Sequence, residues 1–254
     1  MLNYHLDFLP ERPLKPRNTG FTMVMDKGLS VRQAEDFMES GAEYTDIIKL
    51  GWATSLVTPK LEEKLKVYRS CGVPFYLGGT LFECFLVRNA LDDYKKLLNR
   101  FDIEHVEISD GSIEINHQKK CEIITDFAKD FRVLSEVGSK DAEKIIAPYK
   151  WIQMMLDEIS AGSERVIAEA RESGNVGIFR GTGEVRSGLV DEILTKVPND
   201  KIIWEAPNKA QQTWFIKFAG PNVNLGNIAP SEIIPLETLR IGVRSDTFHE
   251  FLPK

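Results

Sequence analysis

The sequence has little cysteine and little histidine, and the few copies present are widely spaced. Its three cysteines are Cys71, Cys84 and Cys121, with no CxxC pair, and its four histidines show no HxH or HExxH pattern. This spacing argues against both a disulfide framework and a zinc site. We therefore expect a protein of the reducing cytoplasm.

Long hydrophobic runs and basic clusters are also missing. No stretch approaches the ~18 apolar residues that are needed to span a bilayer. Residues 1–17 carry charged side chains and three prolines, and they lack the apolar core of a signal peptide. The net charge is −6 and no run of lysine or arginine stands out. We therefore expect neither a membrane partner nor a nucleic-acid partner.

What the sequence does contain is a series of short apolar runs, each ending in polar or charged residues and followed by a helix-like stretch. Eight strands are predicted, at residues 20–26, 44–50, 73–77, 103–109, 132–137, 164–171, 201–206 and 222–228. Strands that alternate with helices indicate a parallel sheet with crossover helices. No GxGxxG motif follows the first strand, which argues against an open dinucleotide-binding sheet. Eight strand–helix units in a chain of 254 residues are typical of a closed (β/α)8 barrel. We therefore predict a single-domain α/β protein, a (β/α)8 TIM barrel over residues 20–254, with an N-terminal extension of residues 1–19.

Three local features follow from the same pattern. Ser30 is placed to cap a helix over residues 30–40. One long helix is predicted from the glycine pair Gly78-Gly79 to about Arg100. The segment 138–148 after the fifth strand is long for a loop between a strand and a helix.

Isolated glutamates stand near the ends of three successive strands. These are Glu136, Glu169 and Glu205, and Glu107 on the fourth strand is a further candidate. A buried carboxylate is costly unless it is paired or binds a cation, and Mg²⁺ prefers oxygen ligands. The pattern therefore predicts a magnesium site at the mouth of the barrel. The alternative is that each glutamate pairs with a lysine or an arginine there.

Five cationic side chains follow the strands and are candidates for the same mouth. They are Lys27, Lys49, Lys140, Arg171 and Arg180. Lys49 follows two isoleucines, so its side chain is predicted to point into the barrel. A salt bridge to Asp26 or to a glutamate is the simpler role for Lys49. Surface solvation is the simpler role for Lys140.

Polar groups for an anion are offered at two further places. Gly78 and Gly79 present backbone N–H groups at a helix start, where anions bind. Asn224 and Asn227 stand near the end of the eighth strand, in a region that often binds phosphate in barrels. A tight turn is the alternative for the glycine pair.

Several sequence blocks follow one another along the chain: TMVMDKG (22–28), DIIKLGW (46–52), GGTLFE (78–83), VEISDG (106–111), SEVG (135–138), EARESG (169–174), EAP (205–207) with QQ (211–212), NLGNIA (224–229) and LETLR (236–240). Taken in this order, the blocks resemble the phosphosulfolactate synthase family. The resemblance covers about residues 20–248 and touches all eight strand ends. Two places depart from the family: one lysine of the loop after the fifth strand is lost and Lys140 is kept, and Phe179-Arg180 stands where an acidic residue is frequent.

The resemblance implies Mg²⁺-dependent addition of sulfite to phosphoenolpyruvate, giving (2R)-phospho-3-sulfolactate, by a cytoplasmic homo-oligomer. It makes Lys140 the candidate proton donor, with Lys49 and Lys27 as further catalytic candidates. Arg171 and Arg180 would help to neutralise the two anionic substrates. Two alternatives remain open: a Schiff-base aldolase with Lys49 or Lys140 as nucleophile, and a non-catalytic, stress-associated relative of the family, which loss of the strand-end charges would favour.

Overall fold

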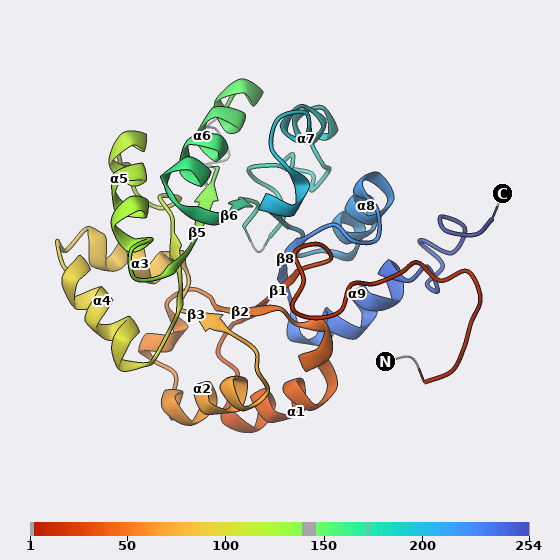
Figure 1. Cartoon of the computed structure of the whole chain (residues 1–254), viewed down its shortest axis with the longest axis horizontal. Helices are drawn as coiled ribbons and strands as arrows, with labels where there is room; N and C mark the ends of the chain where they lie inside the picture. Colours follow the sequence, from red (N-terminus) through yellow and green to blue (C-terminus); the bar gives the residue numbers. More distant parts are fainter. Residues whose placement is uncertain (1–2, 139–145, 172, 254) are drawn as a thin grey trace.

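The computed structural model describes residues 3–138, 146–171 and 173–253. Eight parallel strands form one sheet in the order β3-β2-β1-β8-β7-β6-β5-β4, and the sheet curls into a nearly closed barrel (Figure 1). The strands are β1 (Thr22–Asp26), β2 (Ile47–Leu50), β3 (Phe75–Tyr76), β4 (His105–Ile108), β5 (Arg132–Val137), β6 (Ser163–Ala168), β7 (Ile202–Glu205) and β8 (Leu225–Ile228). The predicted single-domain (β/α)8 barrel is confirmed, although most strands are shorter than predicted.

The helices surround the strands, as Figure 1 shows. They are α1 (Val31–Gly41), α2 (Leu61–Ser70), α3 (Gly79–Leu86), α4 (Leu91–Arg100), α5 (His117–Phe127), α6 (Pro148–Ala161), α7 (Ser187–Leu194), α8 (Lys209–Ala219) and α9 (Ile233–Arg240), with short 3₁₀ turns at Ala42–Tyr44, Thr54–Leu56, Asn199–Lys201 and Pro230–Glu232. Ser30 caps α1 as predicted, in a capping box with Gln33. The predicted single helix up to Arg100 is wrong. The chain breaks between α3 and α4, where Asn89 has a left-handed φ of 53° that a continuous helix does not allow.

Strand alternation divides the core into two layers. Side chains that point out of the barrel pack against the helices in one large cluster. Side chains that point inward form a second cluster of Phe21, Met23, Ile47, Tyr76, Leu134, Ile167 and Ile203. Because successive side chains on a strand alternate faces, the residue two positions after an inward apolar residue also points inward. Polar and charged residues take this next position on several strands, so the apolar interior ends where the mouth begins.

The barrel has a seam between β3 and β4, which are the two ends of the sheet order. Within the described residues, no strand pairing joins these two strands. Side chains bridge the seam instead: Glu107 of β4 accepts the backbone N–H of Gly79 at 2.8 Å. Glu83 of α3 accepts the Ser109 hydroxyl at 2.5 Å and the backbone N–H of Ser112 at 3.0 Å. The carboxyl end of the seam is therefore closed by buried carboxylates.

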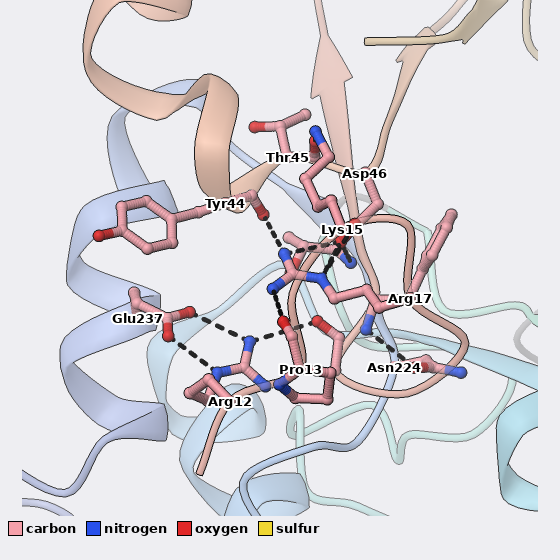
Figure 2. A network of polar contacts seen from close by, with 12 residues as sticks. Arg12, Pro13, Lys15, Arg17, Tyr44, Thr45, Asp46, Asn224 and Glu237 are labelled. Atoms are coloured by element: carbon pink, nitrogen blue, oxygen red, sulfur yellow. Dashed lines mark hydrogen bonds and ion pairs between the residues drawn. The ribbon is translucent and has the colours of Figure 1, made fainter. Parts of the chain in front are cut away.

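The segment before β1 closes the opposite, amino-terminal end of the barrel and runs beside α9 (Figure 1). Arg17 donates to both carboxylate oxygens of Asp46, at 2.9 and 3.0 Å, and to the carbonyl of Tyr44. Arg12 pairs with Glu237 of α9 at 2.8 Å. Figure 2 shows both arginines in one network with the start of β2. In the parts of the chain that the structure describes, no helix is long and apolar enough to cross a membrane.

Removing Arg17 is expected to destabilise the fold. The side chains of Arg17 and Asp46 are each only 4% exposed, so Arg17→Met would leave a buried carboxylate without its counter-charge. Breaking such a pair costs about 3–5 kcal/mol in the free energy of unfolding, which urea denaturation would measure. Asp46→Asn in the same chain should recover part of the loss. If the free energy of unfolding of Arg17→Met alone lay within about 1 kcal/mol of the wild-type value, this account would be contradicted.

Candidate active site

A pocket of about 220 Å³ opens at the carboxyl ends of the strands. Four strand-end glutamates and one lysine line it together with polar and apolar residues of the loops. The lining residues are Met25, Lys49, Trp52, Gly79, Thr80, Glu107, Ser112, Glu136, Glu169, Arg171, Glu205 and Asn227. Active sites of barrel enzymes lie at this face because the strand ends and their loops converge there.

The Lys49 ammonium lies among three buried carboxylates. Its Nζ is 3.0 Å from Glu107 Oε2, 3.4 Å from Glu205 Oε1 and 3.5 Å from Glu136 Oε2. Burial by itself would lower the pKa of Lys49, but the three carboxylates outweigh it and raise that pKa well above its usual range. The predicted inward orientation is confirmed. The ion pair with a glutamate also exists, whereas Asp26 points outward and pairs with Lys64 at 2.6 Å.

Three of the predicted ligands come together as a group. Glu136, Glu169 and Glu205 each offer a carboxylate oxygen, and these oxygens lie within 4.8 Å of one another. Backbone groups orient two of them: Ala170 N–H donates to Glu205 Oε2 at 2.9 Å, and Arg171 N–H donates to Glu169 Oε1 at 2.6 Å. Burial raises the pKa of Glu205 to about 7, opposed by Lys49 and reinforced by Glu136.

The chemistry of this donor set fits a hard cation. All three groups are carboxylates, which suit Mg²⁺ and Mn²⁺, and they are nearly inaccessible to water. Four buried glutamates line the pocket with a single buried lysine, so the pocket carries excess negative charge. Such an excess is costly in a water-poor site unless a cation is bound there. The group could hold a divalent cation.

Glu107 stands apart from that group. One of its oxygens accepts the Gly79 N–H and the other faces Lys49. A side chain on Gly79 would lie within 2.4 Å of Glu107 Oε1, so only glycine allows this approach. The helix start at Gly79 therefore does bind an anion, but that anion is a carboxylate of the protein. Gly78 next to it has a φ of 76° and lies against the Leu50 carbonyl, which makes it part of the turn.

The remaining predicted residues are divided between the pocket and other parts of the surface. Arg171 and Asn227 line the pocket. Lys27 is not among the lining residues, but its ammonium lies 4.7 Å from the ring centre of Trp52, which lines the pocket. Arg180 lines a separate pocket with Pro148 and Leu189. Lys140 lies outside the described residues.

Asn224 is placed at the other end of the barrel. Because β8 begins at Leu225, Asn224 precedes the strand. Its side chain accepts the Phe21 N–H and donates to the carbonyls of Asn18 and Asp200. The structure therefore does not bring Asn224 to the mouth.

Three lining residues went unnoticed in the sequence: Met25, Thr80 and Ser112. The alternation of β1 could have found Met25, which follows the inward residue Met23 by two positions. Thr80 lies in the first turn of α3 and Ser112 lies in a loop, so strand periodicity gives no direction for either side chain.

A (β/α)8 barrel with charged strand-end residues gathered in one pocket defines this chain as a barrel enzyme. The sequence profile of the (2R)-phospho-3-sulfolactate synthase (ComA) family matches residues 10–246. The chain therefore belongs to that family, as the sequence blocks predicted.

Individual relatives agree with this assignment. The phosphosulfolactate synthase of Bacillus subtilis is 42% identical over 94% of this chain and 96% of the relative. The phosphosulfolactate synthase of Methanothermobacter thermautotrophicus is 44% identical over 95% of this chain and 96% of the relative. The Arabidopsis thaliana protein HEAT-STRESS-ASSOCIATED 32 is 21% identical over 91% and 88%.

Solved structures with the same fold are much more distant in sequence. A 3-hexulose-6-phosphate synthase superposes with a TM-score of 0.56 at 14% identity, over 87% of this chain and 99% of the other. A phosphonopyruvate hydrolase in complex with oxalate and Mg²⁺ superposes with a TM-score of 0.53 at 13% identity, over 85% of this chain and 77% of the other. At such low identity the likeness supports the barrel fold alone.

Proposed function

We propose that this chain is a phosphosulfolactate synthase, a lyase that adds sulfite to phosphoenolpyruvate to give (2R)-phospho-3-sulfolactate. The observation that carries the proposal is a family match over almost the whole chain. It is supported by the buried charged side chains at the mouth of the barrel. Those charges are Lys49, Glu107, Glu136, Glu169 and Glu205. The homo-oligomeric state and the cytoplasmic location stay predictions.

The reaction forms one carbon–sulfur bond and takes up one proton. The sulfur lone pair of sulfite bonds to C3 of phosphoenolpyruvate, and the C2=C3 electron pair moves toward C2 and the substrate carboxylate. A proton then adds to C2, and no group leaves. Catalysis therefore requires groups that stabilise negative charge on the carboxylate and a donor that faces C2.

Glu136, Glu169 and Glu205 would hold Mg²⁺ in this scheme. When bound, the ion supplies electrostatic stabilisation of the charge that develops on the substrate carboxylate. The chain's own cations would do the remaining neutralisation. Lys49 is fixed by its carboxylate neighbours, and Arg171 and Lys27 stand nearer to solvent where anionic substrates enter.

The environment of Lys49 disfavours a Schiff-base mechanism with that residue. A Schiff-base lysine must lose its proton, which requires a lowered pKa. The carboxylates around Lys49 raise its pKa instead. Borohydride with a carbonyl substrate would trap an aldolase covalently, and we expect no trapping here. The non-catalytic alternative is disfavoured because the strand-end charges are retained and the match to the synthases is stronger than that to the heat-stress protein.

The test is direct. The purified chain is incubated with sulfite, phosphoenolpyruvate and Mg²⁺, and the adduct is followed by mass spectrometry. We expect a product that depends on all three components and disappears on chelation with EDTA. Absence of product, under conditions in which the Bacillus subtilis relative forms it, would refute the proposed function.

A further inference from the structure

Another buried ammonium, besides those of Lys49 and Lys64, lies outside the barrel, directly behind the strand that carries Glu136. Lys120 of α5 is almost fully buried, and its Nζ reaches three acceptors. It donates to Asp110 Oδ1 at 2.9 Å and to the Glu136 carbonyl at 2.5 Å, and it forms an ion pair with Glu158 Oε1 at 2.9 Å. An ammonium has three donors, and the Lys120 ammonium has three close contacts: two hydrogen bonds and one ion pair.

The Glu136 carbonyl needs this partner because the neighbouring strand has ended. Pairing between β4 and β5 stops at Ile108 opposite Ser135. On the other side, β6 bonds to Val137, since the N–H of Glu169 donates to the Val137 carbonyl. Carbonyls of a strand alternate sides, so that of Glu136 faces the end of β4. Lys120 supplies the donor that a longer β4 would have supplied.

The contact fixes the backbone of one residue of the three-glutamate group. The Glu136 side chain points into the barrel, where its carboxylate faces Lys49 and belongs to the group with Glu169 and Glu205. We propose that Lys120 is a positioning residue: it holds the end of β5 so that the Glu136 carboxylate stands in the geometry that binds a divalent cation. This inference rests on the proposed function, because it assumes that Glu136 is a metal ligand.

The same ammonium fixes a loop of the mouth. Asp110 belongs to the loop after β4, and Ser112 of that loop lines the pocket. Glu83 holds Ser109 and Ser112 from the other side. Lys120 therefore ties one candidate ligand and one pocket loop to the same point on α5.

The variant that tests the proposal must keep the buried charges balanced. Glu158 is fully buried, so Lys120→Met alone would leave its carboxylate with only the His117 ring, 3.7 Å away, as a neighbour that can carry positive charge. Such a loss could unfold the protein. Lys120→Met combined with Glu158→Gln removes both charges and keeps similar volumes. Asp110 is partly exposed and can be solvated. Circular dichroism and thermal unfolding would verify that the double variant folds.

The readout is the affinity for Mn²⁺, measured by calorimetry without substrate, so that it does not depend on turnover. Loss of a group that orients a metal ligand typically weakens metal affinity about 10–100-fold, and we expect a loss in that range. The matched control is Arg17→Met with Asp46→Asn, which removes a similarly buried ion pair at the opposite end of the barrel. That control should lose stability and keep its Mn²⁺ affinity within about twofold of wild type.

Two negative results have different meanings. A folded Lys120→Met/Glu158→Gln protein with wild-type Mn²⁺ affinity would show that Lys120 only fills space, and the proposed function would stand. A wild-type protein that binds no Mn²⁺ would refute the metal site, and with it the role we assign to Lys120.

Discussion

Glu205→Gln is expected to weaken Mn²⁺ binding about 10³-fold and to abolish most sulfite addition. One unit charge at 4 Å contributes about 4 kcal/mol at an effective dielectric near 20, and 1.4 kcal/mol is a factor of ten. Glutamine keeps the shape of the side chain and its acceptor for the Ala170 N–H, so the change removes charge with little change in packing. Calorimetry with Mn²⁺ and steady-state kinetics at saturating Mg²⁺ would measure both effects.

Lys49→Met provides a control, because it is expected to change the Mn²⁺ affinity in the direction opposite to that of Glu205→Gln. Its ammonium lies next to the same carboxylates, so removing it should tighten Mn²⁺ binding. Turnover should still fall, by about 10²–10³-fold, because a preorganised donor is lost. If both variants shifted Mn²⁺ affinity in the same direction, the effects would reflect general damage to the mouth, and the metal site would lose its support.

Lys140→Ala is expected to lower kcat about 10²–10⁴-fold with a much smaller change in substrate binding, which is the range of general acid catalysis. The residue lies outside the described residues, and the prediction comes from the sequence. Gly138, two positions earlier, packs against the Glu169 side chain at the mouth. Steady-state kinetics with Mg²⁺ saturating would separate kcat from KM.

Lys140→Arg distinguishes a proton donor from a simple positive charge. A guanidinium keeps the charge but does not give up its proton near neutral pH, so this variant should fail as Lys140→Ala does. Near-wild-type kcat with only a raised KM in either variant would make Lys140 a binding residue. The donor would then be sought at Lys27 or Lys49.

The sequence predicted the barrel and the core of the site because both depend on strand periodicity. An inward apolar residue is followed two positions later by a polar one, as in Ile203 and Glu205 or Ile47 and Lys49. That spacing places the charged side chain at the mouth whichever residue begins the strand.

Periodicity cannot indicate where a strand begins or which way a loop turns. Asn224 was predicted together with Asn227 near the end of the eighth strand, whereas β8 begins only at Leu225, after Asn224. The side chain consequently lies at the amino end. Arg180 lies in an irregular segment, and its direction depends on tertiary packing.

Long-range pairs were equally beyond the sequence. Nothing in the sequence singles out Lys120, yet it is buried against Asp110 and Glu158. Its partner on α6 is almost forty positions away along the chain. Only the packing of α5 against α6 and β5 brings these groups together.

The seam between β3 and β4 has a consequence for the motions of the barrel. β3 has two residues and pairs through its backbone with β2 alone among the described strands. Amide protons along this edge can therefore reach solvent by local opening that leaves the other strands paired. Such opening would separate Gly79 from Glu107 and so disturb the partners of Lys49. We accordingly expect that ligand binding at the mouth slows hydrogen exchange at the seam and that loss of the ligand speeds it up.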